Sequence, residues 1–222
     1  MSTAATAIRA FYDALRERYG PQEWWPAKTP FEVMVGAILT QNTNWKNVEK
    51  AIENLRKAEA LDPHALRATP REKLAELIRP AGYYNVKAAR LSNLIKTLVD
   101  EYGGDLDAFF AGSVASLRER LLAVKGVGRE TADSIILYAA AKPTFVVDTY
   151  TYRVALRHGL ISEDAAYEEL KSLFEDNLPE DASLFNEYHA LIVRVGKDHC
   201  RKVARCEGCP LERFPHHREL PT

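Results

Sequence analysis

A tight turn with two glycines, and one aspartate that follows it, are the residues best suited to chemistry in this chain. Gly126 and Gly128 stand on either side of a valine, and Asp148 follows 20 residues after Gly128. Glycine lets the backbone turn sharply and approach a ligand closely. A helix that starts at Arg129 would also point free N–H groups at the turn, which favours a bound phosphate. A carboxylate at a fixed distance from such a turn can act on whatever carries the phosphate.

Basic residues flank this turn. Lys125 precedes Gly126, and Arg129 follows Gly128, so a DNA phosphate would suit the site. Phosphate contacts hold DNA in place but carry no sequence information. A glycine at the bend between two helices is also common in ordinary helix packing, so the turn alone does not establish DNA binding.

The three cysteines of the chain form a second group with a chemical signature. Cys200, Cys206 and Cys209 follow the spacing C-x5-C-x2-C. Three cysteines do not make a disulfide framework, and thiols clustered in this way in a cytosolic chain are typical of metal ligation. We therefore expect a metal loop over residues 200–209.

The composition is that of a soluble globular protein with nearly balanced charges. The net charge is −1 over 222 residues, so any binding of nucleic acid must come from local basic patches. No run of about 18 apolar residues is present, and we therefore expect no membrane span. The first residues read as an amphipathic helix rather than as a signal peptide. A cytoplasmic monomer is the expected form.

The pattern of apolar residues predicts an all-helical chain. Apolar side chains recur at helical spacing, and the apolar segment 144–147 is too short to carry a sheet. Residues 29–32 and 69–72 both read as a capping box, with proline at the first helical position. Further helices are expected over 87–99, on both sides of the glycine turn, and from near positions 148, 162 and 181.

Several segments resemble one known protein family. LLAVKGVGRETADSIILYA, followed by VVDTYTYRVALRHG, resembles the helix-hairpin-helix DNA glycosylases of the endonuclease III superfamily. FEVMVGAILTQNT resembles the early helix and glutamine turn of that family, and AGYYNVKAARL resembles a second segment that faces nucleic acid. VGKDHCRKVARCEGCPL resembles its iron–sulfur loop. The matching segments run from roughly residue 20 to residue 212 in the family's order.

The resemblance implies two all-helical lobes with a DNA cleft between them. One lobe is expected to be discontinuous, formed by residues 1–24 and 136–222, and to carry the cysteine loop. The other is expected to be a helical barrel over residues 25–135, with the helix-hairpin-helix motif at 114–141. The implied partner is double-stranded DNA that contains a damaged base, so the protein would be associated with the nucleoid when bound.

The resemblance places the catalytic aspartate of the family at Asp148. The simpler interpretation is a helix N-cap, and the two roles are compatible, because N–H donors keep a carboxylate ionised. An ionised carboxylate can stabilise an oxocarbenium-like sugar and assist a water molecule. Glu130 fills the position at which bifunctional members carry the lysine that forms a Schiff base. A carboxylate cannot form an imine, so the sequence predicts base removal without efficient strand cleavage.

The three tryptophans suggest how the base is bound. Trp24, Trp25 and Pro26 precede the first barrel helix, and Trp45 follows the glutamine turn, as in the lysine-less 3-methyladenine branch of the family. Tryptophans are also common in cores. An alkylated adenine carries positive charge, and its stacking between indoles gains about 0.5–2 kcal/mol of cation–π attraction. We expect Trp24 and Trp45 to stack on the flipped base, with Trp25 and Pro26 forming the wall.

Two further residues are candidate DNA contacts. Gln41 matches the family position that fills the gap left by the flipped base, although a polar residue at a helix end is the plainer interpretation. Lys87 is a candidate phosphate contact beside two tyrosines, with a solvated lysine as the alternative.

The cysteine loop departs from the family pattern, which is C-x6-C-x2-C-x5-C around a [4Fe–4S] cluster. The first gap is one residue short, and Pro215 stands at the fourth position. A cubane needs four ligands. His216 is the best candidate, and His199 and His217 are others. Three cysteines and one histidine would also suit zinc.

These observations predict a monofunctional glycosylase of base excision repair that acts on alkylated purines such as 3-methyladenine. One alternative is a glycosylase for mismatched thymine or uracil, or for an oxidised pyrimidine, with or without lyase activity. A DNA-damage-binding module without catalysis is an alternative of another class.

Overall fold

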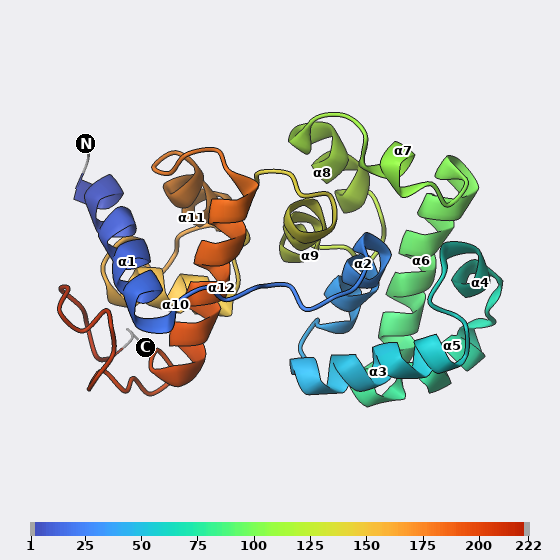
Figure 1. Ribbon diagram of the computed structural model, residues 1–222, viewed down its shortest axis with the longest axis horizontal. Coiled ribbons are helices and arrows are strands. Elements are labelled where there is room, and N and C mark those ends of the chain that lie inside the picture. The colour runs from blue at the N-terminus through green and yellow to red at the C-terminus, as the bar shows by residue number, and fades with distance from the viewer. Residues whose placement is uncertain (1–2, 220–222) are drawn as a thin grey trace. The chain divides into compact units, whose positions relative to one another are not determined.

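A computed structural model describes residues 3–219, and within that range the chain consists of helices and loops without a strand (Figure 1). The prediction of an all-helical fold is confirmed. The expected ends of the discontinuous lobe, residues 1–2 and 220–222, lie outside the described residues. The elements are α1 (Thr3–Tyr19), α2 (Pro30–Leu39), α3 (Trp45–Lys57), α4 (Pro63–Ala68), α5 (Arg71–Leu77), the 3-10 turn η1 (Arg79–Ala81), α6 (Tyr84–Tyr102), α7 (Leu106–Phe110), α8 (Val114–Leu122), α9 (Arg129–Ser134), the π-helical turn η2 (Ile135–Ala139), α10 (Thr149–Arg157), α11 (Tyr167–Glu175) and α12 (Ala182–Asp198).

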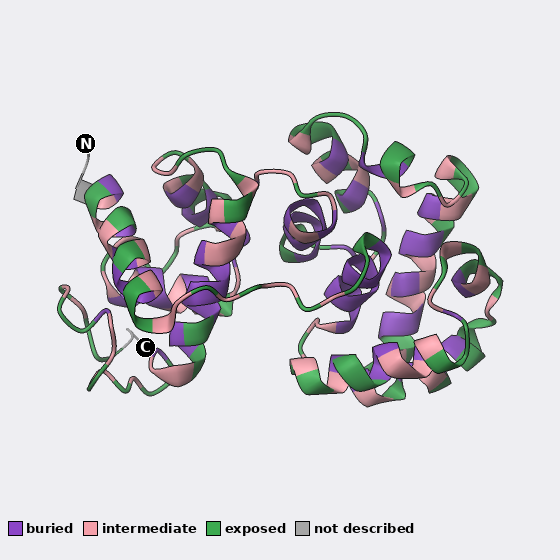
Figure 2. Cartoon of the chain, viewed as in Figure 1, coloured by how far each residue is buried: buried purple, intermediate pink, exposed green. Residues whose placement is uncertain are grey.

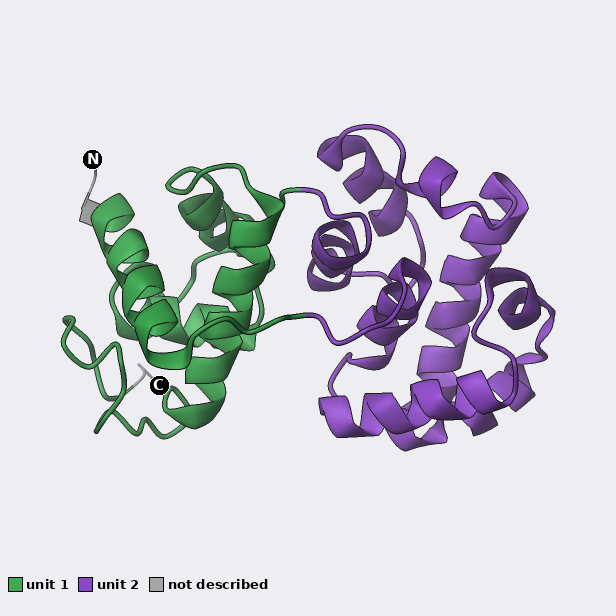
Figure 3. Cartoon of the chain, viewed as in Figure 1, with its two compact units in different colours: residues 1–24, 143–222 green, residues 25–142 purple. Residues whose placement is uncertain are grey.

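The chain forms two compact units (Figure 3). The discontinuous unit contains residues 1–24 and 143–222, and the continuous unit contains residues 25–142. The continuous unit ends at Lys142, seven residues later than the boundary at 135/136 that was expected from the sequence. The reason is local, because η2 continues α9 without a break and packs against α2, which keeps residues 136–139 with the continuous unit.

The continuous unit is organised around α2. Nine of its ten residues, from Phe31 to Leu39, are buried, which explains the unbroken apolar run in the sequence (Figure 2). Thr29 caps this helix as expected, because its side-chain oxygen accepts a hydrogen bond from the Glu32 amide at 3.1 Å. The long helix α6 packs against α2, α4 and α5 and buries leucines at helical spacing.

The discontinuous unit is organised around α12, which packs against α1 and α10. The Tyr188 hydroxyl donates to the carbonyl of Ile8 at 2.7 Å, so the first helix is fastened to the last. Phe145 stacks on Phe174 with ring centroids 4.1 Å apart. No helix within residues 3–219 is long and apolar enough to span a lipid bilayer.

Two expected helix starts are wrong. Thr69 does not cap α5; its hydroxyl donates back to the carbonyl of Ala65 at 2.8 Å and ends α4, a short helix that the sequence pattern did not reveal. Near Ser162 the chain forms turns, and α11 begins only at Tyr167. In both places the side-chain hydroxyl donates a hydrogen bond to a residue within four positions, Ala65 for Thr69 and Asp164 for Ser162. Such local hydrogen bonds compete with helix capping.

Candidate active site, DNA interface and cysteine loop

The turn of the hairpin joins α8 to α9 and has two different glycines. Gly126 has φ +103°, and a Cβ there would collide with the aliphatic part of the Arg90 side chain. Gly126 is therefore required by the fold itself. Gly128 is exposed, and a Cβ added to it would meet no protein atom within 4 Å. Lys125 and Arg129 are also exposed, so the outer side of the turn is open to a ligand.

Gln41 is bound to the hairpin. Its Nε2 donates to the Thr131 hydroxyl at 3.0 Å and to the Gly126 carbonyl at 3.3 Å. Its Oε1 accepts from Arg90 at 2.5 Å. A second residue of α6, Asn93, donates to the Lys125 carbonyl at 2.9 Å. Sequence reasoning missed Arg90 and Asn93, which brace the turn from a helix distant in the sequence.

Lys87 does not face solvent, and the expectation of a phosphate contact is corrected. Its residue is 1% exposed, and its ammonium donates to the carbonyls of Leu39 at 2.8 Å and Ala81 at 2.7 Å. Burial lowers the pKa of Lys87 to about 8, with a further contribution from the charge of Arg90. The ammonium closes the ends of α2 and η1, where carbonyls lack helical partners.

The most exposed large side chain of this segment is Tyr83. It is 72% exposed and has a left-handed backbone with φ +46° at the start of α6. A non-glycine residue in this region is strained, and an exposed aromatic ring leaves apolar surface in water. One signal for this residue was present in the sequence, the pair of tyrosines before Lys87. We treated these tyrosines only as neighbours of Lys87 and not as candidate DNA contacts.

The tryptophans are divided between the two units. Trp25 and Trp45 meet edge to face in the continuous unit, with ring centroids 5.1 Å apart, and Tyr138 lies against Trp25 at 5.0 Å. Both indoles lie next to Gly36, where an added Cβ would be in ordinary van der Waals contact with them at 3.5–3.6 Å. Pro26 is exposed beside this cluster in the sequence. Trp24 belongs to the discontinuous unit, where the Lys197 ammonium lies 5.6 Å from its ring centroid.

Asp148 is the N-cap of α10, as the simpler interpretation predicted. Its Oδ1 accepts from the Thr151 amide at 2.8 Å and from the Thr151 hydroxyl at 3.0 Å. Its Oδ2 lies 3.6 Å from Nε2 of His189. Burial alone would raise the pKa of Asp148, but His189 and the two Thr151 donors outweigh it, and the net pKa is below the usual value. The carboxylate is therefore ionised at neutral pH.

Sequence reasoning missed His189. It lies on α12, 5% exposed, and packs near the ring of Phe145. A single histidine among apolar residues of a helix gives no local signal of its partner, which is 41 positions earlier in the chain. Glu130, in contrast, is exposed in the first turn of α9, as its sequence position predicts.

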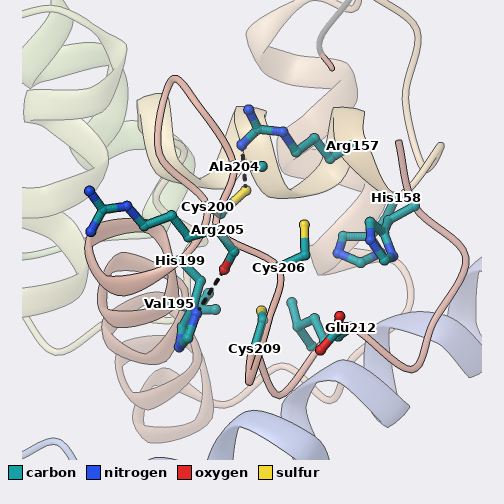
Figure 4. Close-up of a pocket in the computed structure, with 12 residues that line it drawn as sticks. Arg157, His158, Val195, His199, Cys200, Ala204, Arg205, Cys206, Cys209 and Glu212 are labelled. Carbon is teal, nitrogen blue, oxygen red and sulfur yellow. Dashed lines mark hydrogen bonds between the residues drawn. The ribbon is translucent and has the colours of Figure 1, made fainter. Parts of the chain in front are cut away.

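The three cysteines line one pocket of the discontinuous unit (Figure 4). Burial raises the pKa of the Cys209 thiol to about 11, and the neighbouring Cys200 and Cys206 act in the same direction. A metal centre at this pocket must therefore displace the proton of the Cys209 thiol. The rest of the lining comprises Arg157, His158, Val195, His199, Ala204, Arg205, Leu211, Glu212 and His216.

The lining of this pocket can be compared with what the two expected metal centres, zinc and a [4Fe–4S] cluster, require. Among residues 3–219, no three His, Cys, Asp or Glu side chains are grouped closely enough to hold one metal ion. A four-iron cluster differs, because each thiolate binds a different iron atom. His199 and His216 line the pocket and His217 does not; His158, which we did not predict, does.

Comparisons with known proteins agree with this architecture. The profile of the HhH-GPD superfamily of base excision DNA repair proteins matches residues 35–180. A Methanocaldococcus jannaschii protein, provisionally named a DNA repair glycosylase, is 51% identical over 93% of this chain and 94% of its own length. Endonuclease III of Thermotoga maritima is 32% identical over 82% of this chain and 81% of its own.

Solved structures give the same result. The Helicobacter pylori 3-methyladenine DNA glycosylase MagIII, bound to 1,N6-ethenoadenine, has a TM-score of 0.74 and 31% identity, and the match covers 88% of this chain and 98% of MagIII. A trapped endonuclease III–DNA covalent intermediate has a TM-score of 0.82 and 27% identity, with 96% of each chain covered. This chain belongs to the HhH-GPD superfamily of base excision DNA repair proteins.

Proposed function

We propose that this protein is a monofunctional DNA glycosylase, which acts as a monomer on double-stranded DNA and hydrolyses the N-glycosidic bond of a flipped damaged base. The observation that carries the proposal is Asp148, an ionised, largely buried carboxylate held at both of its oxygens. A fixed negative charge of this kind stabilises the positive charge that develops on the sugar as the bond breaks. It also orients or deprotonates the attacking water.

The residue at the first turn of α9 supports hydrolysis rather than Schiff-base chemistry. Glu130 stands where bifunctional relatives of the resembled family carry lysine. Lys87 is buried against two carbonyls, and the backbone of Lys125 is braced by Asn93 at the hairpin turn, which suits a phosphate contact. Without an amine at the sugar carbon, no imine forms and strand cleavage does not follow.

The aromatic cluster supports an alkylated purine as the substrate. Trp25, Trp45 and Tyr138 present several π-faces within one unit, and the MagIII structure, which holds an ethenoadenine, shares 31% identity with this chain. A cationic 3-alkylated adenine gains from stacking on indole and is already a good leaving group, so a single carboxylate suffices. We retain Trp24 as the proposed second stacking residue and Pro26 as part of the pocket wall.

We propose that the hairpin and the start of α6 make the main contacts with DNA. Gly126 shapes the turn, Gly128 lets a phosphate approach the backbone, and Lys125 and Arg129 add positive charge. The exposed ring of Tyr83 can stack on a base, as aromatic side chains do at unstacked nucleotides. We propose that Gln41 leaves its hairpin contacts to fill the gap that base flipping creates.

We also propose a [4Fe–4S] cluster on Cys200, Cys206 and Cys209. Their shared pocket and the resemblance of VGKDHCRKVARCEGCPL to the family's iron–sulfur loop support it. The cluster would act as a structural centre that orders the basic loop from Lys197 to Arg205 against DNA, because metal-bound loops are fixed by their ligands. Base chemistry remains with Asp148.

The experiment that tests the proposal is single-turnover base release from defined duplexes. One duplex set carries 3-methyladenine or ethenoadenine, and others carry mismatched thymine, mismatched uracil or an oxidised pyrimidine. We expect release from the alkylated purines, followed by no strand break until alkali is added. Release from a mismatch or oxidised-pyrimidine duplex alone would replace the substrate class, and binding without any release would leave a damage-binding module.

A further inference from the structure

The cysteine pocket contains a buried cation without a carboxylate partner. Arg157, at the end of α10, is 3% exposed. Its Nη1 donates to the carbonyl of Arg201 at 2.7 Å, and its Nη2 donates to the carbonyl of Lys202 at 3.0 Å. No ion pair to Arg157 occurs among residues 3–219, and its Nε is buried there without a hydrogen-bond partner. A buried charge is costly unless something neutralises it.

The hydrogen bonds of the Arg157 guanidinium indicate which group could carry the negative charge that would balance it. Nη1 of Arg157 also donates to Sγ of Cys200 at 3.1 Å (Figure 4). A hydrogen bond from a cation is stronger when its acceptor carries negative charge, as a metal-bound cysteine sulfur does. Glu212, the one carboxylate of the pocket lining, is exposed and accepts instead from the Gly208 amide at 3.1 Å. Sulfur is therefore the anion that Arg157 is positioned to meet.

A neutral fourth ligand would balance this charge. A [4Fe–4S]²⁺ core with three thiolates and one neutral imidazole has a net charge of about −1. Arg157 supplies one positive charge, and the sum is close to zero. A fourth thiolate would leave an excess negative charge in a pocket that has only this one buried cation among the described lining residues.

His216 has the geometry of a neutral imidazole ligand. Its Nδ1 lies 2.8 Å from the carbonyl of Phe214, which places the proton on Nδ1 and leaves the lone pair on Nε2. It also lines the cysteine pocket and follows Pro215, which stands where the family's fourth cysteine would be. His158 and His199 are the competitors, because the Nδ1 of each also faces a carbonyl at 2.9 Å, that of Pro215 and that of Arg205. The His158 ring is packed edge to face against Phe11 at 4.7 Å, and neither histidine lies beside the family's fourth ligand position as His216 does.

We propose that Nε2 of His216 completes the ligand set of the three cysteines, and that Arg157 is the buried counter-charge that donates to the sulfur of this centre. The inference rests on the proposed iron–sulfur cluster. It assigns roles to two residues that the family's four-cysteine pattern does not contain. Hydrogen bonds to cluster sulfurs and the identity of the fourth ligand both set the reduction potential.

The test uses the full chain purified without oxygen, with ¹⁵N-labelled histidine in a parallel sample. Iron and sulfide are assayed, and the dithionite-reduced protein is examined by pulsed EPR for coupling to nitrogen. We expect a cubane with strong histidine-nitrogen coupling. If no iron–sulfur cluster is present, the proposed cofactor itself fails. If the cluster is present without such coupling, His216 is not its ligand and only this inference fails.

Variants identify the nitrogen. His216→Gln should lose the coupling and at least half of the bound iron, and His217→Gln, the matched control at the next position, should keep both. His216→Cys should restore iron without the nitrogen signal and lower the reduction potential. Coupling that survives His216→Gln but disappears in His158→Gln or His199→Gln would overturn the assignment. For Arg157→Gln, which removes the positive charge, we expect a more negative potential, and Arg157→Lys, which keeps the charge, should stay closer to the wild type. An unchanged potential in Arg157→Gln contradicts the counter-charge role.

Discussion

Nε2 of His189 lies 3.6 Å from Oδ2 of Asp148, while Oδ1 of the same carboxylate is occupied by the amide and hydroxyl of Thr151. One oxygen of the proposed catalytic group is thus used to begin α10, and the other faces an imidazole. The helix fixes the position of the carboxylate, and the histidine lowers its pKa against the effect of burial. This division explains how one aspartate can serve both as a cap and as a catalyst.

The first prediction concerns this pair. In His189→Gln, the contribution that lowers the pKa of Asp148 is lost, so that pKa rises. Because the ionised carboxylate is the active form, the acid limb of single-turnover base release should move to higher pH. Base release at alkaline pH should be largely retained, which a merely unfolded variant would not show. An acid limb that coincides with that of the wild type and of His64→Gln, an exposed control, would contradict the role of His189.

The second prediction concerns Glu130. Wild-type protein should give no borohydride-trapped DNA adduct, because no amine stands at the first turn of α9. Glu130→Lys should yield a trapped adduct and strand cleavage, and Glu130→Gln, the matched uncharged control, should yield neither. Efficient trapping by the wild type that persists in Glu130→Ala would show that another amine attacks the sugar.

The third prediction concerns the aromatic cluster. Trp45→Ala should slow release of 3-methyladenine by roughly twofold to thirtyfold, the range that corresponds to a lost cation–π contact. DNA binding should persist, and Trp45→Phe should keep most of the rate. Trp24→Ala and Trp25→Ala are measured in parallel with thermal melts, because Trp25 also packs against Trp45 and Tyr138. Unchanged single-turnover rates in Trp45→Ala would remove it from the base pocket.

The fourth prediction concerns stability and pH at Lys87. Its pKa is about 8 in the folded protein and 10.5 in a free lysine, so between these values the unfolded state binds more protons. The unfolding free energy should therefore rise with pH over this window, by at most about 3 kcal/mol. Denaturant titrations of Lys87→Met should lack this rise, and Lys96→Met, exposed on the same helix, should retain it. Identical pH dependence in Lys87→Met and wild type would contradict the burial of a charged ammonium.

Local sequence rules predicted the features that depend on neighbouring residues. The N-caps at Asp148 and Thr29 both form within three positions of the chain. The turn lies at Gly126 as predicted, but the Glu32 carboxylate, the other half of the expected capping box, binds Arg56 at 3.1 Å instead. The same rules failed at Thr69, where two local hydrogen-bonding patterns compete and the end of α4 prevails over the start of α5.

Features that depend on distant contacts could not be read from the sequence. Lysine is a residue type that is usually found on the surface, and only the packing of α2 and η1 around Lys87 shows that it is buried. His189 and Arg157 acquire their roles from partners on other helices or loops. Each of these polar side chains has at least one partner more than 40 positions away, so periodicity and motif spacing do not reveal the contact.

The most direct test of the account is base release by Asp148→Asn. Asparagine retains the oxygen that caps α10, so the variant should fold and bind damaged DNA like the wild type. It lacks the negative charge, and single-turnover release of the damaged base should fall by about 10²- to 10⁴-fold. Release within a few-fold of the wild-type rate, with binding intact, would contradict the claim that Asp148 is the catalytic group.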